Sequence, residues 1–349
     1  MASVVASRAR RSSSVERIEP DLTALWRDVA HDEPVSRAVM SNLVVFCRCP
    51  VDTGEDVELP HADLGVDEVV QRHPARVIVL GHDPSTGARR DRSSPVISAS
   101  VEVLTFGTSG ARYGVEQIVI RSACGDAAIR SIVRQLTLGD IPTTVWWTED
   151  LSTTEPLTPL VKMGRQFLYD SRCWADVRAA TLALAPLLTD PFRPDLADRN
   201  WRRLAPVRRA LHFALESRDA AHHGATTPLR VRHRHGETAL AWLMAGWAHV
   251  AEHVRHVTDR PIADVRLEPP TEDTRMDGDV LTASLDDGFR LRVTDDRVIV
   301  EDPVGLPPFA VALSREPEAD AIAGELGVLA EDATFHQVLA ALVGHFQRG

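Results

Sequence analysis

Two short, continuous apolar runs constrain the fold of this chain more than any other feature. Residues 43–47 and 76–80 read LVVFC and RVIVL, and a loop with a short helical pattern at 66–71 separates them. Such runs are typical of strands that are buried on both faces of a sheet. Further strands are expected at 96–106, 115–121, 141–147 and 166–169, with helices at 21–30, 126–138 and 174–188. Strands that alternate with helices predict an α/β sheet domain.

The pattern changes after residues 190–194 (DPFRP), where two prolines break the preceding helix and we place a domain boundary. Beyond it, helices are expected near 207–218 and at 238–257, with a strand at 229–233. Alternating runs at 279–285, 289–294 and 297–301 are joined by Asp-rich turns, which predicts an antiparallel meander. Two closing helices, at 318–326 and 335–346, are expected to cover one face of it.

These patterns define the predicted fold class as α/β. An N-terminal α/β sheet domain at 21–192 is followed by an α+β domain at 193–349, which has an antiparallel β-meander and closing helices. Residues 1–20 are rich in Arg and Ser and lack the apolar segment of a signal peptide. We expect them to form a disordered tail.

Charge and cysteine content exclude several classes of function. The chain has 39 basic and 50 acidic residues, and its net charge of −11 repels nucleic acids and anionic membrane surfaces, so neither is an expected partner. No apolar run approaches about 18 residues, so no transmembrane helix is expected. Four cysteines without a secretory signal fit a reducing compartment, and we expect a cytoplasmic protein. Cys47 and Cys49 are expected to be buried thiols, because a bridge across one residue has poor geometry.

The string His249-Val250-Ala251-Glu252-His253 is the sharpest enzyme-like signal. On a helix, H-x-x-E-H presents two metal ligands and a general base, as in some metalloproteases. On a helical wheel for 238–257 the apolar side chains lie within about 60° of Trp247, and His249, His253 and His256 lie opposite. A third ligand would come from Glu325 or Glu331. The main interpretation is a polar or partner-facing histidine stripe, and a metal-dependent hydrolase is the alternative.

Other short motifs carry less chemistry. Ser109 lies in Gly107-Thr108-Ser109-Gly110, which lacks the spacing of a G-x-S-x-G nucleophile turn. Asp170 and Ser171 follow a short strand and precede a helix, where they are expected to cap the helix or, alternatively, to contact a ligand or partner. The sequence has no G-x-G-x-x-G or C-x-x-C motif, and we expect no cofactor.

Tryptophan is unusually frequent, with seven residues against two tyrosines. Trp146 and Trp147 are adjacent on a predicted strand, so their side chains point to opposite faces of the sheet. Each is expected either in the core or at a cleft at the carboxyl end of the strand. Trp242 lies about 140° from Trp247 on the helical wheel, away from the apolar face. It is expected to be covered by the other domain or to face a partner.

Two longer segments resemble a known family. Residues 121–126 (RSACGD) and 135–147 (QLTLGDIPTTVWW) look like the signature of the glucose-6-phosphate dehydrogenase assembly protein family, which is OpcA-like. Further segments agree with this family and occur in the same order along the chain, at 42–45, 73–80, 169–171 and 198–206. The resemblance extends from about residue 42 to the tryptophans at 242 and 247.

The resemblance implies a protein without catalytic activity of its own. Such a protein is expected to bind glucose-6-phosphate dehydrogenase, to promote its oligomeric assembly and to act as an allosteric effector that raises its activity. The pathway served would be the oxidative pentose phosphate pathway, with its supply of NADPH. Tryptophan and arginine are the residue types most often found at interface hot spots. The candidate partner contacts are Trp146, Trp147, Asp170, Ser171, Trp201, Arg202 and Trp242.

Overall fold

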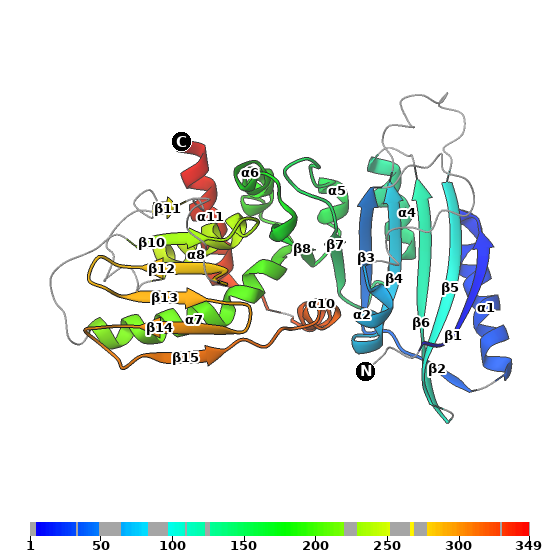
Figure 1. The fold of residues 1–349 in the computed structure, drawn as a ribbon. Helices are drawn as coiled ribbons and strands as arrows, with labels where there is room; N and C mark the ends of the chain where they lie inside the picture. Colours follow the sequence, from blue (N-terminus) through cyan, green and yellow to red (C-terminus); the bar gives the residue numbers. More distant parts are fainter. Residues whose placement is uncertain are drawn as a thin grey trace.

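The computed structural model describes residues 5–32, 34–48, 64–82, 97–108, 110–122, 126–219, 229–251, 266–268, 278–328 and 330–348. Two sheets lie side by side, each with helices packed against it (Figure 1). The predicted fold class is confirmed, with an α/β sheet in the N-terminal part and an antiparallel meander with helices in the C-terminal part. No helix in the described ranges is long and apolar enough to cross a membrane.

The first sheet has nine strands within the described residues, in the order β1-β5-β6-β4-β3-β7-β8-β9, and β2 pairs with β6. The six strands from β6 to β9 in this order are parallel, whereas β5 pairs antiparallel with β6 and β1 pairs antiparallel with β5 at one edge. All carboxyl ends of the parallel strands therefore meet at one edge of the sheet. The bounds are β1 (Val5–Ser13), β2 (Val35–Arg37), β3 (Ser41–Arg48), β4 (Ala75–His82), β5 (Ile97–Thr108), β6 (Ala111–Ser122), β7 (Thr143–Trp147), β8 (Gln166–Tyr169) and β9 (Asp195–Asp198).

Both faces of this sheet are covered, which explains why β3 and β4 are apolar along their length. Side chains of one face pack with four helices, and those of the other face pack with two. The first group is α1 (Ile18–Asp32), α4 (Asp126–Leu136), α5 (Thr158–Val161) and α6 (Val177–Leu188). The second group is α2 (Val66–Arg72) and α10 (Glu318–Gly327).

The second sheet has the strand order β11-β10-β12-β13-β14-β15. The predicted meander is β12 to β14, and its first turn contains Gly288, whose φ of +96° favours glycine. The helices that lie on this sheet are α7, which packs on β14, and α8, which packs on β10. The strands are β10 (Arg230–His233), β11 (Arg266–Glu268), β12 (Leu281–Ser284), β13 (Arg290–Val293), β14 (Arg297–Glu301) and β15 (Phe309–Ala312), and the helices are α7 (Arg199–Asp219), α8 (Thr238–Val250) and α11 (Ala333–Arg348).

The two closing helices pack elsewhere than predicted. Helix α11 packs mainly on α8 and α6, because its apolar face meets theirs in the shared core. Helix α10 packs against α2, where Ile322 and Leu326 join the core on one face of the first sheet (Figure 1). The C-terminal part of the chain therefore covers part of the N-terminal sheet.

The disordered tail predicted for 1–20 is wrong for residues 5–13, which form the edge strand β1, and for residues 15–20, which form a 3-10 turn and the start of α1. Arg8 and Arg10 lie on either side of Ala9, and they are 3.4 and 3.3 Å from the buried carboxylate of Glu102 on β5. Strand β9 begins after the predicted boundary at 192/193 and still joins the first sheet. The two domain limits stay a prediction, and the chain crosses between the sheets after Asp198.

Candidate interaction site at the carboxyl ends of the strands

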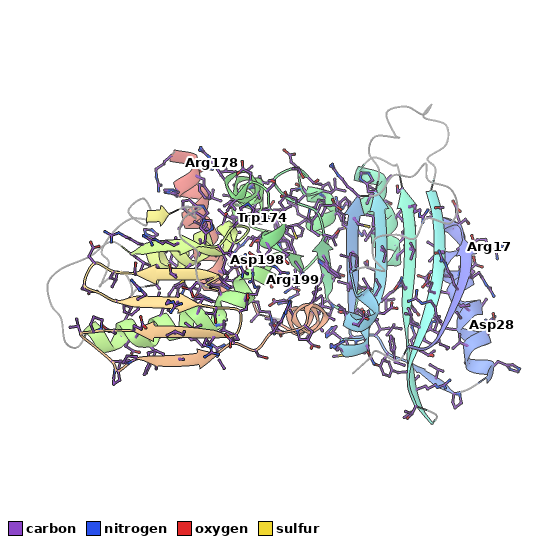
Figure 2. The ribbon with its side chains drawn as sticks, in the orientation of Figure 1. Arg17, Asp28, Trp174, Arg178, Asp198 and Arg199 are labelled. Atoms are coloured by element: carbon purple, nitrogen blue, oxygen red, sulfur yellow. The ribbon has the colours of Figure 1, made fainter. Side chains whose placement is uncertain are left out.

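The carboxyl ends of β7, β8 and β9 bring Trp147, Tyr169 and Asp198 to one edge of the first sheet. The chain continues from β8 into a single 3-10 turn, η3 (Ser171–Cys173), and from β9 directly into α7. Trp174, Asp198 and Arg199 lie between the two sheets in Figure 2. Open α/β sheets commonly place binding sites at this edge.

Asp170 caps η3, as its position after a strand predicts. Its Oδ1 accepts a 3.0 Å hydrogen bond from the backbone N–H of Arg172. Its carboxylate also lies 2.8 Å from the Arg172 guanidinium and 3.0 Å from that of Arg199. Burial raises the pKa of Asp170, but the hydrogen bonds and charges of the two arginines outweigh it and hold the pKa below its usual value. Asp170 is therefore an ionised, paired carboxylate.

Asp198 lies in the opposite electrostatic environment. Its side chain is buried, and Oδ1 accepts hydrogen bonds from the backbone N–H groups of Ser171, at 3.0 Å, and Asn200, at 2.9 Å. No Lys or Arg forms an ion pair with it in the part of the chain that the structure describes. Burial, reinforced by the nearby negative charge of Asp170, raises the pKa of Asp198 to about 7. Two neighbouring carboxyl groups thus have pKa values shifted in opposite directions.

Several buried polar atoms around these carboxyl groups have no hydrogen-bond partner among the described residues. They are Nε1 of Trp147, the hydroxyl of Tyr169, Nδ2 of Asn200 and Nε1 of Trp174. The rings of Tyr169 and Trp174 are stacked with centroids 5.6 Å apart. Buried polar groups are normally paired, so such a concentration of free donors is typical of a site that holds water or a small polar ligand.

Two arginines in the first turn of α7 tie this edge to α10. Nη1 of Arg199 is 3.0 Å from Asp170 and 2.5 Å from Glu318. Arg202 forms two 2.8 Å bonds to Glu316 and a 3.2 Å bond to Glu325. The hydrogen bonds to Glu316 raise the pKa of Arg202 above its usual value. Arg202, predicted as a partner contact, is engaged by its own chain.

The predicted tryptophan contacts are core residues. Trp146 and Trp147 are 3% and 1% exposed and belong to the cores on opposite faces of the sheet, as their adjacency predicts. Trp201 is buried and donates a 2.7 Å hydrogen bond from Nε1 to Asp332. Because this chain already covers all three side chains, they offer little surface to a partner.

Trp242 is half-buried, and its own chain covers it. Its ring packs edge-on against Phe346, with centroids 4.8 Å apart, and lies 5.4 Å from the ring of His345. Both residues belong to α11, so the covering element comes from the C-terminal half and not from the other domain. The structure favours internal packing over a free partner contact at this position.

The helix that carries the start of the metal-site alternative ends earlier than predicted. Helix α8 ends at Val250, where Ala251 is extended with φ −70° and ψ 114°, whereas the prediction placed its end at 257. His249 lies in the last turn, whereas Glu252, His253 and His256 lie outside the described residues. Glu325 and Glu331 pair with Arg202 and Arg193. Within the described ranges, no group of three His, Cys, Asp or Glu side chains could hold a metal ion.

The remaining motifs have structural roles where they are described. The buried thiol of Cys47 donates to the carbonyl oxygen of Leu80 at 3.7 Å, whereas Cys49 lies outside the described residues. Gly107 and Gly110 have φ values of +99° and +85° in the turn between β5 and β6, and Ser109 between them is also outside the described residues.

Sequence reasoning found Asp170 and Ser171 but did not select Asp198. The sequence signal that could have identified Asp198 is an acidic residue at the end of a short strand, directly before a helix.

Comparisons with known proteins agree with the predicted family. The chain matches the model of the glucose-6-phosphate dehydrogenase subunit N-terminal domain at residues 66–186 and that of the C-terminal domain at 194–339. No curated protein sequence matches the chain.

Solved structures that are similar include apo scyllo-inositol dehydrogenase from Lactobacillus casei, at 10% identity, with 88% of this chain and 96% of that chain covered and a TM-score of 0.35. A second structure of the same enzyme, at 77K, gives a TM-score of 0.34 with the same identity and coverage. At these values the likeness carries no functional conclusion. The two family matches span most of the chain in order, and the chain belongs to the OpcA family of glucose-6-phosphate dehydrogenase assembly proteins.

Proposed function

We propose that this protein is a non-catalytic subunit that binds glucose-6-phosphate dehydrogenase in the cytoplasm, promotes its oligomeric assembly and raises its activity. In this role it supports the oxidative pentose phosphate pathway and its supply of NADPH. The observation that carries the proposal is the match of both halves of the chain, in order, to the two domains of a dehydrogenase subunit. An effector shifts an equilibrium only by its differential affinity for the two states. The protein must therefore bind the assembled, active dehydrogenase more tightly than the dissociated one.

The surface that we assign to this partner is the outer edge of β15. This strand pairs only with β14 among the described strands, so its other edge presents unpaired backbone N–H and C=O groups. Ala310, Val311 and Ala312 are exposed, and the ring of Phe213, 54% exposed on α7, meets Phe309 edge-on at 5.6 Å. The edge and the adjacent helix thus form one apolar surface.

The sequence of this edge supports a protein partner. Edge strands are normally protected from pairing by charged side chains. Residues 303–314 carry no charged residue, although 26% of the chain is charged. A strand of the dehydrogenase that adds to β15 would satisfy its free backbone groups and cover its apolar side chains.

The proposal is tested by mixing the purified chain with the dehydrogenase of the same organism and measuring the particle mass by light scattering. A mass above that of the dehydrogenase alone, with the chain present in the particle, is expected. Val311→Lys places a charge on the edge and should weaken the complex at least tenfold, whereas Val311→Thr, which keeps the β-branched shape, is the matched control. A complex that forms equally with Val311→Lys refutes the β15 surface only. No complex with the unsubstituted chain refutes the function itself.

A further inference from the structure

An open pocket of about 580 Å³ lies in the C-terminal half, between α7, α8 and α11. Arg208 and His212, four residues apart on one face of α7, line one side, and Arg209 borders it from the same helix. Trp247 and Val250 of α8 form an apolar wall. The volume falls within the range of pockets that hold small molecules, and none of these residues belongs to the site at the strand ends.

Arg208 is the unusual group in this pocket. Its guanidinium lies 3.4 Å from the centre of the Trp201 ring, and its Nε is buried without a hydrogen-bond partner among the described residues. Burial lowers the pKa of Arg208 to about 10, since no paired carboxylate compensates for the lost hydration. Arg199, Arg202 and Arg203 of the same helix each pair with an acidic side chain.

The charge of Asp332 raises the pKa of Arg208, but it does not offset the effect of burial. Both oxygens of Asp332 already accept hydrogen bonds, Oδ2 from Nε1 of Trp201 at 2.7 Å and Oδ1 from the backbone N–H of Phe335 at 2.9 Å. No ion pair joins Arg208 to a carboxylate in the described part of the chain. An anion that enters the pocket would therefore supply the partner that this guanidinium lacks.

A second arginine reaches the pocket. Arg209 is exposed, and among the described residues its Nε donates only a long 3.4 Å bond to the backbone oxygen of Ala205 on its own helix. Thr334, in the first turn of α11, also lines the pocket. The carboxylate of Asp332 already caps this helix through the N–H of Phe335, so recognition of an anion falls to the two arginines. Their donors and charge suit a phosphate group.

We propose that this pocket binds a small phosphorylated metabolite, with its phosphate on Arg208 and Arg209 and its less polar body against Trp247 and Val250. The inference rests on the pocket alone and does not depend on binding of the dehydrogenase. It places a small-molecule site within the segment that matches the C-terminal family domain.

Calorimetric titration of the full chain tests this site, with glycerol 3-phosphate, glucose 6-phosphate and inorganic phosphate as probes at constant ionic strength. Saturable binding of at least one phosphate monoester, stronger than binding of acetate, is expected. Arg208→Met should weaken it at least tenfold, and Arg27→Met, at an exposed position on α1, should leave it unchanged.

Circular dichroism monitors the fold of each variant. If Arg208→Met fails to fold, the exposed Arg209→Met decides, with a loss of at least threefold expected. Absence of saturable binding by any phosphate probe overturns the proposal, as does equal affinity in the arginine variants. Acetate that binds as tightly as the phosphates would overturn the assignment of the ligand as a phosphate.

Discussion

The indole Nε1 of Trp201 donates a 2.7 Å hydrogen bond to Oδ2 of Asp332, which joins the first turn of α7 to the residue that precedes α11. The other oxygen of Asp332 accepts from the N–H of Phe335, so one carboxylate fixes both helices. The rings of Trp201 and Phe335 are also stacked, with centroids 5.0 Å apart. This arrangement commits Asp332 to helix packing and leaves Arg208, above the same indole ring, without an acidic partner among the described residues.

Trp201→Phe keeps most of the stacked ring but removes the donor to Asp332. Loss of this hydrogen bond should lower the free energy of unfolding by only about 0.5 to 1.5 kcal/mol, because Asp332 is exposed and water can replace the indole donor. Trp201→Ala removes the ring as well and should cost about 3 to 5 kcal/mol. Urea denaturation of the two variants measures both values. Equal losses would show that the hydrogen bond, and not the ring, holds α7 against α11.

Asp198 should make the stability of the protein depend on pH. The fold raises the pKa of Asp198 from 3.8 to about 7, so the folded state binds this proton more tightly than the unfolded state. The stabilisation that this proton gives is fully present below pH 3.8 and is lost as the pH rises through 7. Asp198→Asn should therefore flatten the decrease in unfolding free energy between about pH 5 and 8.

The amide oxygen that Asp198→Asn introduces can still accept from the two backbone N–H groups, so the comparison isolates the charge. Chemical denaturation at four pH values is the measurement. Asp286→Asn, at an exposed site, is the control and should keep the pH dependence of the unsubstituted chain. An unchanged pH profile in Asp198→Asn would show that the Asp198 carboxyl is ionised throughout this range.

Arg199 should contribute more to stability than an exposed arginine. Its side chain is 10% exposed and lies between Asp170 and Glu318, so Arg199→Met leaves the buried Asp170 short of a partner. We expect a loss of about 3 to 5 kcal/mol, the usual result of breaking a buried ion pair from one side. Arg297→Met breaks the surface pair with Asp296 and should cost far less, because fully exposed ion pairs contribute little to stability. Similar losses in the two variants would mean that the junction at Asp170 is solvated.

Substitution of Trp242 tests whether this side chain stabilises the fold by internal packing or contacts a partner. Its contact with Phe346 predicts that Trp242→Ala lowers the free energy of unfolding by about 3 kcal/mol, as other aromatic truncations do. The variant should bind the dehydrogenase normally at temperatures where it stays folded. Paired melting and binding measurements are required. Normal stability with weakened binding would instead identify Trp242 as a contact residue.

The central strands β3 and β4 were predictable because their apolar composition indicates burial. Strands β3 and β4 are buried on both faces, and only continuous apolar runs satisfy that environment. Strand β1 was missed because its alternating arginines resemble a solvated tail, and their pairing with Glu102 on β5 is a long-range contact. Strand β9 was missed because only two of its four residues, Leu196 and Ala197, are apolar.

The part of the site that depends only on neighbouring residues in the sequence was predictable. Asp170 caps the turn after a strand, which depends on neighbouring residues only. The burial of Asp198 depends on Ser171, which is distant in sequence and reaches it only when β8 and β9 pair. The pocket at Arg208 requires three helices to meet, and no sequence pattern specifies that meeting. The end of α8 at Val250 was missed because the apolar and histidine pattern continues past it.

The central claim, that this chain promotes assembly of glucose-6-phosphate dehydrogenase, is tested most directly by diluting the dehydrogenase and following its specific activity with and without the chain. An oligomer that needs assembly to be active loses specific activity on dilution, and a subunit that binds the assembled form shifts that loss to lower concentration. We expect the specific activity to persist to at least tenfold lower dehydrogenase concentration when the chain is in excess. Identical dilution curves with and without the chain would contradict the claim.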